Sequence, residues 1–298
     1  MNTPNTYQAY LKQLEAGLCL LPDKPEETAV SSLHALWQLA AGRPMSVQRA
    51  NETPLPELTP AAHQLLAELI QQRLAGRPLA HLTRRQQFMQ LEFIVGPEAL
   101  VPRKETELLA RTAQALLDDI LQRQDSARVI DVCTGAGNIA LSLAHYHAHC
   151  HVAAADLSAD AIRLAEQNRD HLQLQERVDF QVGDLLAPFA NDQFFGKIDL
   201  LTCNPPYISS GKLDKMPEEI AGHEPQLAFD GGPFGLNIVG RLLKVAPQYL
   251  KSNGWVVFEV GLGQGEPLQN RLSRNPDYQQ INTYRDNEDH IRVLALQV

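Results

Sequence analysis

Asn204, Pro205, Pro206 and Tyr207 form the stretch of this chain best suited to chemistry. They follow an apolar run, residues 198–203, that is typical of a buried strand. Proline has no backbone N–H and fixes its own backbone, so the strand must end here in a stiff turn. Asn204 and Pro205 can each accept one N–H of a planar –NH2 group through an oxygen atom, and Tyr207 can stack on that group. The alternative is an ordinary loop, since Asn-Pro and Pro-Pro are common in turns.

A turn of small residues, Thr-Gly-Ala-Gly at 134–137, could bind a second reactant. Glycine allows a tight turn and brings backbone N–H groups close to a ligand at a helix N-terminus. Such a turn also suits dinucleotide-binding proteins, but Ala140 stands where their third glycine is expected. Asp156 can bind both hydroxyls of a ribose, and Asp184 can accept a hydrogen bond from an adenine amine.

These candidate residues all follow predicted strands. Ligands of open α/β sheets bind at the carboxyl ends of the strands, where Gly135, Asp156, Asp184 and Asn204 are expected to meet. We therefore expect one nucleoside to lie across this edge, with Asn204 near its reactive end. The alternative is four ordinary turns at strand ends.

Strands and helices alternate from residue 128 onward, which predicts an α/β fold with a doubly wound sheet of seven strands. The expected strands are 128–132, 152–156, 178–182, 198–203, 255–260, 279–282 and 291–298. The expected helices are 138–146, 158–172 and 237–250, together with one that ends near residue 121.

The N-terminal part has a different pattern. Apolar residues recur at helical spacing between residues 7 and 75, and Thr59-Pro60 is a good helix start. Residues 79–104 favour a β-hairpin around Gly96-Pro97. We expect a helical domain at 1–78 for substrate or partner recognition, a hairpin linker at 79–104 and the α/β domain at 105–298.

Composition narrows the functional class. The 298 residues carry a net charge of −9, from 26 Lys and Arg against 35 Asp and Glu, which argues against duplex DNA as a partner. The apolar content of 44% is ordinary, and neither a membrane span nor a signal peptide is evident. The four cysteines are scattered, so neither a zinc site nor a disulfide framework is predicted, and a cytoplasmic location fits.

These motifs together resemble the HemK-type protein (glutamine-N5) methyltransferases, which are class I S-adenosylmethionine-dependent methyltransferases with a Rossmann-like fold. The resemblance runs nearly from end to end. It is carried by the glycine turn, the acidic residues, the Asn-Pro-Pro-Tyr tetrapeptide, and the segments 76–82, 100–103, 223–225, 227–228 and 231–232.

The resemblance implies S-adenosylmethionine as cofactor, S-adenosylhomocysteine as product, and no metal. It implies that the methionine part lies against the glycine turn, the ribose on Asp156, and the adenine beside Asp184 and Leu185. The implied cofactor-binding residues are Cys133, Thr134, Gly135, Ala136, Gly137, Asp156, Asp184, Leu185 and Asn204. Two departures stand out: Val132-Cys133 replaces the frequent Leu-Gly, and Leu185 replaces an aromatic residue of some relatives.

The resemblance also implies that the target is a glutamine amide held by the tetrapeptide. Asn204, Pro205 and Tyr207 are then the catalytic residues, and Pro206 contributes to substrate binding. Arg103 is expected to line the cleft and contact the substrate; the alternative is a solvated helix start.

The class I peptide release factors, methylated in a Gly-Gly-Gln loop, are the first expected substrate, and a ribosomal large-subunit protein is the second. Two other classes stay open. An adenine-N6 DNA methyltransferase would use the same tetrapeptide, but it should have a basic surface. A non-catalytic module would bind the cofactor without methyl transfer.

Overall fold

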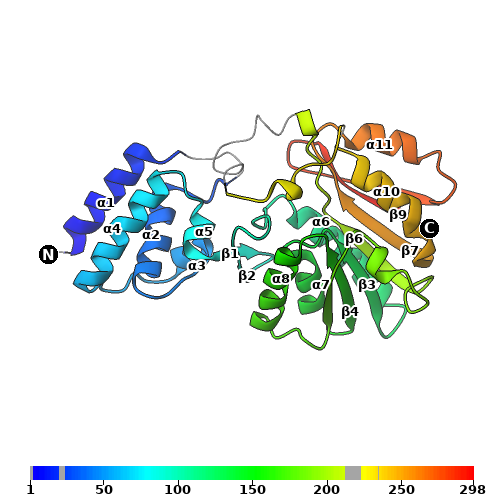
Figure 1. Cartoon of the computed structure of the whole chain (residues 1–298), viewed down its shortest axis with the longest axis horizontal. Helices are drawn as coiled ribbons and strands as arrows, with labels where there is room; N and C mark the ends of the chain where they lie inside the picture. Colours follow the sequence, from blue (N-terminus) through cyan, green and yellow to red (C-terminus); the bar gives the residue numbers. More distant parts are fainter. Residues whose placement is uncertain (1–2, 20–23, 212–222, 234) are drawn as a thin grey trace. The chain divides into compact units, whose positions relative to one another are not determined.

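The computed structural model describes residues 3–19, 24–211, 223–233 and 235–298 (Figure 1). They divide into two compact units. The first takes in the described residues up to 97 together with 223–224, and the second takes in residues 98–211, 225–233 and 235–298. The domain limits expected from the sequence stay a prediction. No helix in the described part of the chain is long and apolar enough to cross a membrane.

The first unit is mainly helical. Its elements are α1 (Thr3–Gly17), α2 (Ala29–Ala40), α3 (Val47–Glu52), α4 (Pro60–Leu74), α5 (Leu79–Thr83), β1 (Arg85–Phe88) and β2 (Leu91–Ile94). The predicted start of α4 is confirmed, since the Thr59 side chain accepts a hydrogen bond from the Ala62 N–H at 3.2 Å. Its apolar core includes Trp37, whose indole N–H donates to the Pro56 carbonyl at 2.8 Å.

The hairpin of β1 and β2 turns at a different place from the one expected. Phe88 pairs with Leu91, so the turn lies at Met89 and Gln90 rather than at Gly96-Pro97. Both turn residues have positive φ, 49° and 64°. Turns of this kind usually carry glycine or asparagine, so Met89 and Gln90 carry no local signal for a turn.

The second unit is built on a seven-stranded sheet with the order β5-β4-β3-β6-β7-β9-β8. Its strands are β3 (Ala127–Val132), β4 (Cys150–Asp156), β5 (Val178–Val182), β6 (Ile198–Cys203), β7 (Leu250–Glu259), β8 (Gln280–Arg285) and β9 (Ile291–Gln297). The five strands β3 to β7 run parallel to one another. Strand β9 is antiparallel to both β7 and β8. The predicted seven strands are confirmed.

Helices pack against this sheet. They are α6 (Glu107–Leu121), α7 (Asn138–Tyr146), α8 (Ala159–His171), α10 (Asn237–Val245) and α11 (Gly265–Leu272). Helix α7 contacts both α6 and α8. Buried residues of α10 and α11 join Ile130, Leu201 and Phe258 of the sheet in one apolar cluster.

Strand order also explains where a ligand can bind. After β3 the chain continues to β4 on one side of it, whereas β6 pairs with β3 on the other side. A crevice forms at such a reversal, outside the carboxyl ends of the strands. Val132 and Cys203 are paired in register, so Cys133 and Asn204 both emerge at this point.

Candidate active site

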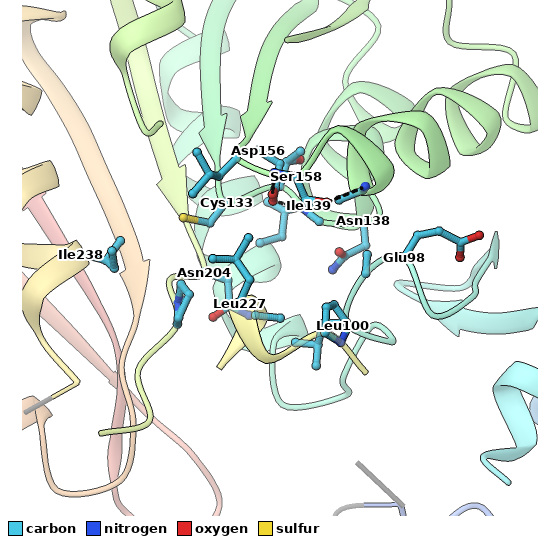
Figure 2. A pocket seen from close by; sticks show the side chains of 18 of the residues that line it. Glu98, Leu100, Cys133, Asn138, Ile139, Asp156, Ser158, Asn204, Leu227 and Ile238 are labelled. Carbon is cyan, nitrogen blue, oxygen red and sulfur yellow. Dashed lines mark hydrogen bonds between the residues drawn. The ribbon is translucent and has the colours of Figure 1, made fainter. Parts of the chain in front are cut away.

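A pocket of about 160 Å³ opens at the carboxyl edge of the sheet in the second unit (Figure 2). It gathers residues from the ends of β3, β4, β5 and β6. Of the predicted site residues, those that line it are Arg103, Cys133, Thr134, Gly135, Asp156, Asp184, Leu185, Asn204 and Pro206. Ala136, Gly137, Pro205 and Tyr207 lie next to these in the chain but outside the lining.

The glycine turn at 134–137 is held in place by the buried carboxylate of Asp131. Asp131, fully buried on β3, accepts hydrogen bonds from the hydroxyls of Thr134 and Thr202, each at 2.6 Å. Burial raises the pKa of Asp131 to about 6, although both hydroxyls oppose the shift. Asp131 thus links the turn after β3 to strand β6, a role that no motif in its local sequence indicates.

Gly137 is the N-cap residue that precedes helix α7, and its φ is +81°. A Cβ atom there would lie 3.0–3.2 Å from side-chain atoms of Phe180, Leu141 and Ala165. Glycine is therefore required both by the backbone angle and by the space. Ala136 is buried, and its carbonyl accepts from Asn168 Nδ2 at 3.0 Å, so the outer side of the turn is also fixed.

Cys133 occupies the left-handed region, with φ of +57°. The resemblance had indicated a glycine at this position in many relatives, and the observed angle gives the physical reason. Its side chain is partly exposed and lines the pocket.

Asp156 is held in one orientation by two backbone groups. Its Oδ2 accepts from the Gly135 N–H and its Oδ1 from the Ser158 N–H, both at 2.9 Å. Burial raises its pKa, and these N–H donors oppose the rise. A carboxylate oxygen can accept more than one hydrogen bond, so both oxygens can still accept from ribose hydroxyls. This fits the expected cofactor.

Asp184 pairs with Arg241 of α10 through its Oδ2. Both side chains are more than 40% exposed, so the pair contributes little and can open for a ligand. Leu185 beside it is nearly buried and has φ of +50°. The expected adenine contacts of both residues stay a prediction.

Asn204 is anchored at one end of its amide group. Its Nδ2 donates to the hydroxyl oxygen of Thr106 at 3.1 Å, across 98 positions of the chain. Among the described residues, none donates a hydrogen bond to Asn204 Oδ1 or to the Pro205 carbonyl. These two oxygen atoms are the predicted acceptors for the N–H groups of a planar –NH2 group.

The other residues of the tetrapeptide are held by neighbouring loops. The Tyr207 carbonyl accepts from Gln264 Nε2 at 2.9 Å, and a Cβ on Gly235 would lie 2.0 Å from that same oxygen. Burial raises the pKa of the Tyr207 hydroxyl, and the nearby Glu259 raises it further. The tyrosine hydroxyl is therefore neutral, and its expected stacking on the substrate stays a prediction.

Arg103 is 9% exposed, which fits a pocket wall better than a solvated helix start.

Other residues that line the pocket were not predicted, because nothing in their local sequence indicates a site. The missed residues include Thr106 and Leu157, and also Glu98, Asn138 and Ile238, which are labelled in Figure 2 together with Leu227. Leu157 and Leu227 are at least half exposed, so the mouth of the pocket is apolar. The described residues contain no cluster of three His, Cys, Asp or Glu that could hold a metal ion.

Comparison with known proteins identifies relatives along most of the chain. Residues 109–232 match the family model of the methyltransferase small domain. A release factor glutamine methyltransferase of Moorella thermoacetica is 39% identical over 233 residues, 78% of each chain. One from Koribacter versatilis is 32% identical and covers 90% of this chain and 89% of its own. A ribosomal protein uL3 glutamine methyltransferase of Xylella fastidiosa is 35% identical over 67% of this chain and 62% of its own.

Solved structures share the fold. The catalytic domain of human METTL16 in complex with an RNA hairpin of MAT2A has a TM-score of 0.55 and 18% identity, covering 75% of this chain and 81% of its own. The N-terminal domain of human METTL16 in complex with S-adenosylhomocysteine has a TM-score of 0.51 and 20% identity with the same coverage. The predicted class I methyltransferase fold is thereby confirmed. The identity to the curated relatives, over more than two thirds of both chains, shows that this chain belongs to the S-adenosylmethionine-dependent release factor glutamine methyltransferases.

Proposed function

We propose that this enzyme transfers a methyl group from S-adenosylmethionine to the side-chain amide nitrogen of a glutamine in a protein. The observation that carries the proposal is the orientation of the Asn204 side-chain amide. Its Nδ2 is engaged by Thr106, so Oδ1 and the neighbouring Pro205 carbonyl are left to accept the two N–H groups of an incoming amide.

The pocket residues support binding of the cofactor. Asp156 would hold the ribose hydroxyls, the turn at 134–137 would contact the methionine part, and Asp184 and Leu185 would border the adenine. Bound in this way, the cofactor supplies an electrophilic methyl group on a sulfonium. S-adenosylhomocysteine is the expected product, and no metal is required.

The chain's own contribution is orientation. An amide nitrogen is a weak nucleophile because its lone pair is delocalised into the carbonyl. Hydrogen bonds from its two N–H groups to Asn204 and Pro205 would raise the electron density on nitrogen and aim it at the methyl carbon. The new N–C bond would form as the S–C bond breaks, with the electron pair of the broken bond left on sulfur, and one proton of the nitrogen would pass to solvent water. Alignment of this kind can supply up to roughly 7–11 kcal/mol of a reaction barrier.

Class I release factors, methylated on the glutamine of a Gly-Gly-Gln loop, are the substrate we propose first. The names of the relatives from Moorella and Koribacter support this choice. A ribosomal large-subunit protein is the second candidate, supported by the Xylella relative. Both belong to translation, so we expect the enzyme to act in the cytoplasm. The net charge of −9 disfavours duplex DNA and is compatible with a basic protein partner.

The test is transfer of a labelled methyl group from S-adenosylmethionine to purified release factor and, separately, to ribosomal large-subunit proteins, with mass spectrometry to locate the methyl. One methyl on the Gly-Gly-Gln glutamine supports the whole proposal. Labelling of a ribosomal protein alone keeps the chemistry and replaces the substrate. Cofactor binding with neither protein labelled rejects both substrates and favours a non-catalytic module.

A further inference from the structure

Glu259, at the end of β7, is a buried carboxylate that the proposed reaction has not yet used. It is 1% exposed and lies in the strand next to β6, which carries Asn204 at its end. Neither of its oxygens has a hydrogen bond of good geometry among the described residues. Arg292 of β9 lies 3.6 Å away, a distance typical of a loose ion pair. A carboxylate in this setting needs further donors to be stable.

Two hydroxyl groups are placed to be those donors. The side chains of Thr106 and Tyr207 are close enough to Glu259 to lower its pKa, as Arg292 does, whereas burial and the charge of Glu105 raise it. The balance is a pKa of about 7, with burial as the largest cause.

A hydrogen bond from Thr106 to Glu259 would decide which end of the Asn204 amide faces the substrate. A threonine hydroxyl has one proton, and when Glu259 accepts that proton the Thr106 oxygen can only accept from Asn204. Its partner must then be Nδ2, which is the arrangement observed at 3.1 Å. Without the carboxylate, Thr106 could equally donate to Oδ1. The asparagine amide would then turn its N–H groups toward the substrate and lose the acceptor that the reaction needs.

A hydrogen bond from Tyr207 to Glu259 would fix the other end of the tetrapeptide. Its carbonyl is already held by Gln264. A hydroxyl that donates to Glu259 adds a second point of attachment, so the ring keeps one orientation. One carboxylate would therefore act on both ends of the tetrapeptide, through Thr106 on the Asn204 side and directly on the Tyr207 side.

We propose that Glu259 and Thr106 are positioning residues that hold the Asn204 amide with its oxygen toward the substrate and hold the Tyr207 ring in place. This proposal rests on the proposed function, because it names the residues that prepare the same site.

The kinetic test compares Thr106→Val with Thr106→Ser on a glutamine-containing substrate. Valine keeps the size and removes the hydroxyl, so we expect kcat to fall by about 10- to 100-fold, the order seen when reacting groups are misplaced. Calorimetric affinity for S-adenosylhomocysteine should change less than twofold. Serine should restore most of the rate. Thr112→Val is the matched control, because this buried hydroxyl on α6 donates only to the Leu108 carbonyl, at 2.8 Å.

Glu259→Gln tests the shared carboxylate. We expect a similar loss of kcat, and the double variant with Thr106→Val should lose little more than the worse single variant, since both changes break one chain of contacts. In the wild type, kcat should fall as the pH drops through about 7 and Glu259 takes up a proton. In Glu259→Gln that fall should be absent or moved to lower pH. Fully additive losses, or an unchanged pH profile, contradict the proposal.

A readout without turnover separates this proposal from the proposed function. The side-chain amide signal of Asn204, assigned by its absence in Asn204→Ala, can be followed by ¹⁵N NMR. It should shift in Thr106→Val and Glu259→Gln and stay in place in Thr112→Val. An inactive wild type with these shifts rejects glutamine methylation and keeps the positioning role. An active wild type with an unmoved signal and a normal rate in Thr106→Val rejects the positioning role alone.

Discussion

At the scale of single residues, the assigned role of Asn204 makes a sharp prediction. Asn204→Ala removes the oxygen that would accept from the target amide, so turnover should fall below detection while affinity for S-adenosylhomocysteine stays nearly unchanged. Enzyme kinetics and calorimetry on the same preparations check both parts. Asn270→Ala, at an exposed position of α11, is the control and should behave like the wild type. Equal loss of activity and cofactor affinity in Asn204→Ala would overturn the assignment.

Cys133 offers a second prediction, because a non-glycine residue there adopts φ of +57°. Cys133→Gly relieves the steric cost of this conformation, about 1–2 kcal/mol, but loses about 0.5–1 kcal/mol through the greater freedom of the unfolded chain. Cys133→Ala removes the thiol and keeps the strain. We expect the glycine variant to exceed the alanine variant by about 0.5–1 kcal/mol in the free energy of unfolding. Urea denaturation measures it, and an alanine variant that is the more stable one contradicts the strain.

At the scale of elements, the position that precedes α7, Gly137, should tolerate no residue other than glycine. Gly137→Ala meets both a positive φ and three close side chains, so we expect a loss of about 1–3 kcal/mol and weaker cofactor binding. Gly240→Ala, inside α10 with open space around it, should instead gain about 0.5–1 kcal/mol. Thermal unfolding of the two variants should therefore shift in opposite directions. A shift in the same direction would contradict the role of glycine in this turn.

The elements also show how far the sequence could predict the structure. Strands β3 to β6 and helix α7 were located closely, because periodicity and turn residues act locally. Helices α3, α5 and α11 were not identified, and the hairpin turn at Met89 was misplaced because its residues carry no turn signal. Most predicted pocket residues do line the pocket, since parallel strands end at one edge. The hydrogen bond from Asn204 to Thr106 joins segments 98 positions apart, so it could not be predicted from any local sequence pattern.

At the scale of the whole molecule, the buried acids set a pH dependence of stability. The pKa of Glu259 is raised from 4.5 to about 7, so the folded state binds its proton more tightly than the unfolded state does. This contribution to stability is present at low pH and is lost as the pH rises from about 4.5 to 7. Asp131 adds a similar loss between its reference value of 3.8 and about 6.

Glu259→Gln removes the first of these two losses. The free energy of unfolding of this variant, relative to that of the wild type, should therefore rise between pH 5 and pH 8. The expected rise is on the order of 3 kcal/mol, because each unit of pKa shift corresponds to about 1.36 kcal/mol. Urea denaturation of both proteins at several pH values measures this difference. Asp131 is unchanged in both proteins, so its contribution cancels. A difference that is constant with pH would show that Glu259 titrates normally.

The place of β9 has a consequence for how the enzyme is made. This strand lies between β7 and β8, although it follows both in the chain, and its Arg292 stands beside Glu259. A nascent chain can form β3, β4 and β5 early, and with them the region expected to bind the nucleoside. The edge of β7 and the surroundings of Glu259 are complete only once β9 has left the ribosomal exit tunnel. An enzyme proposed to modify the translation machinery would thus complete the surroundings of Glu259 only after the ribosome has synthesised β9.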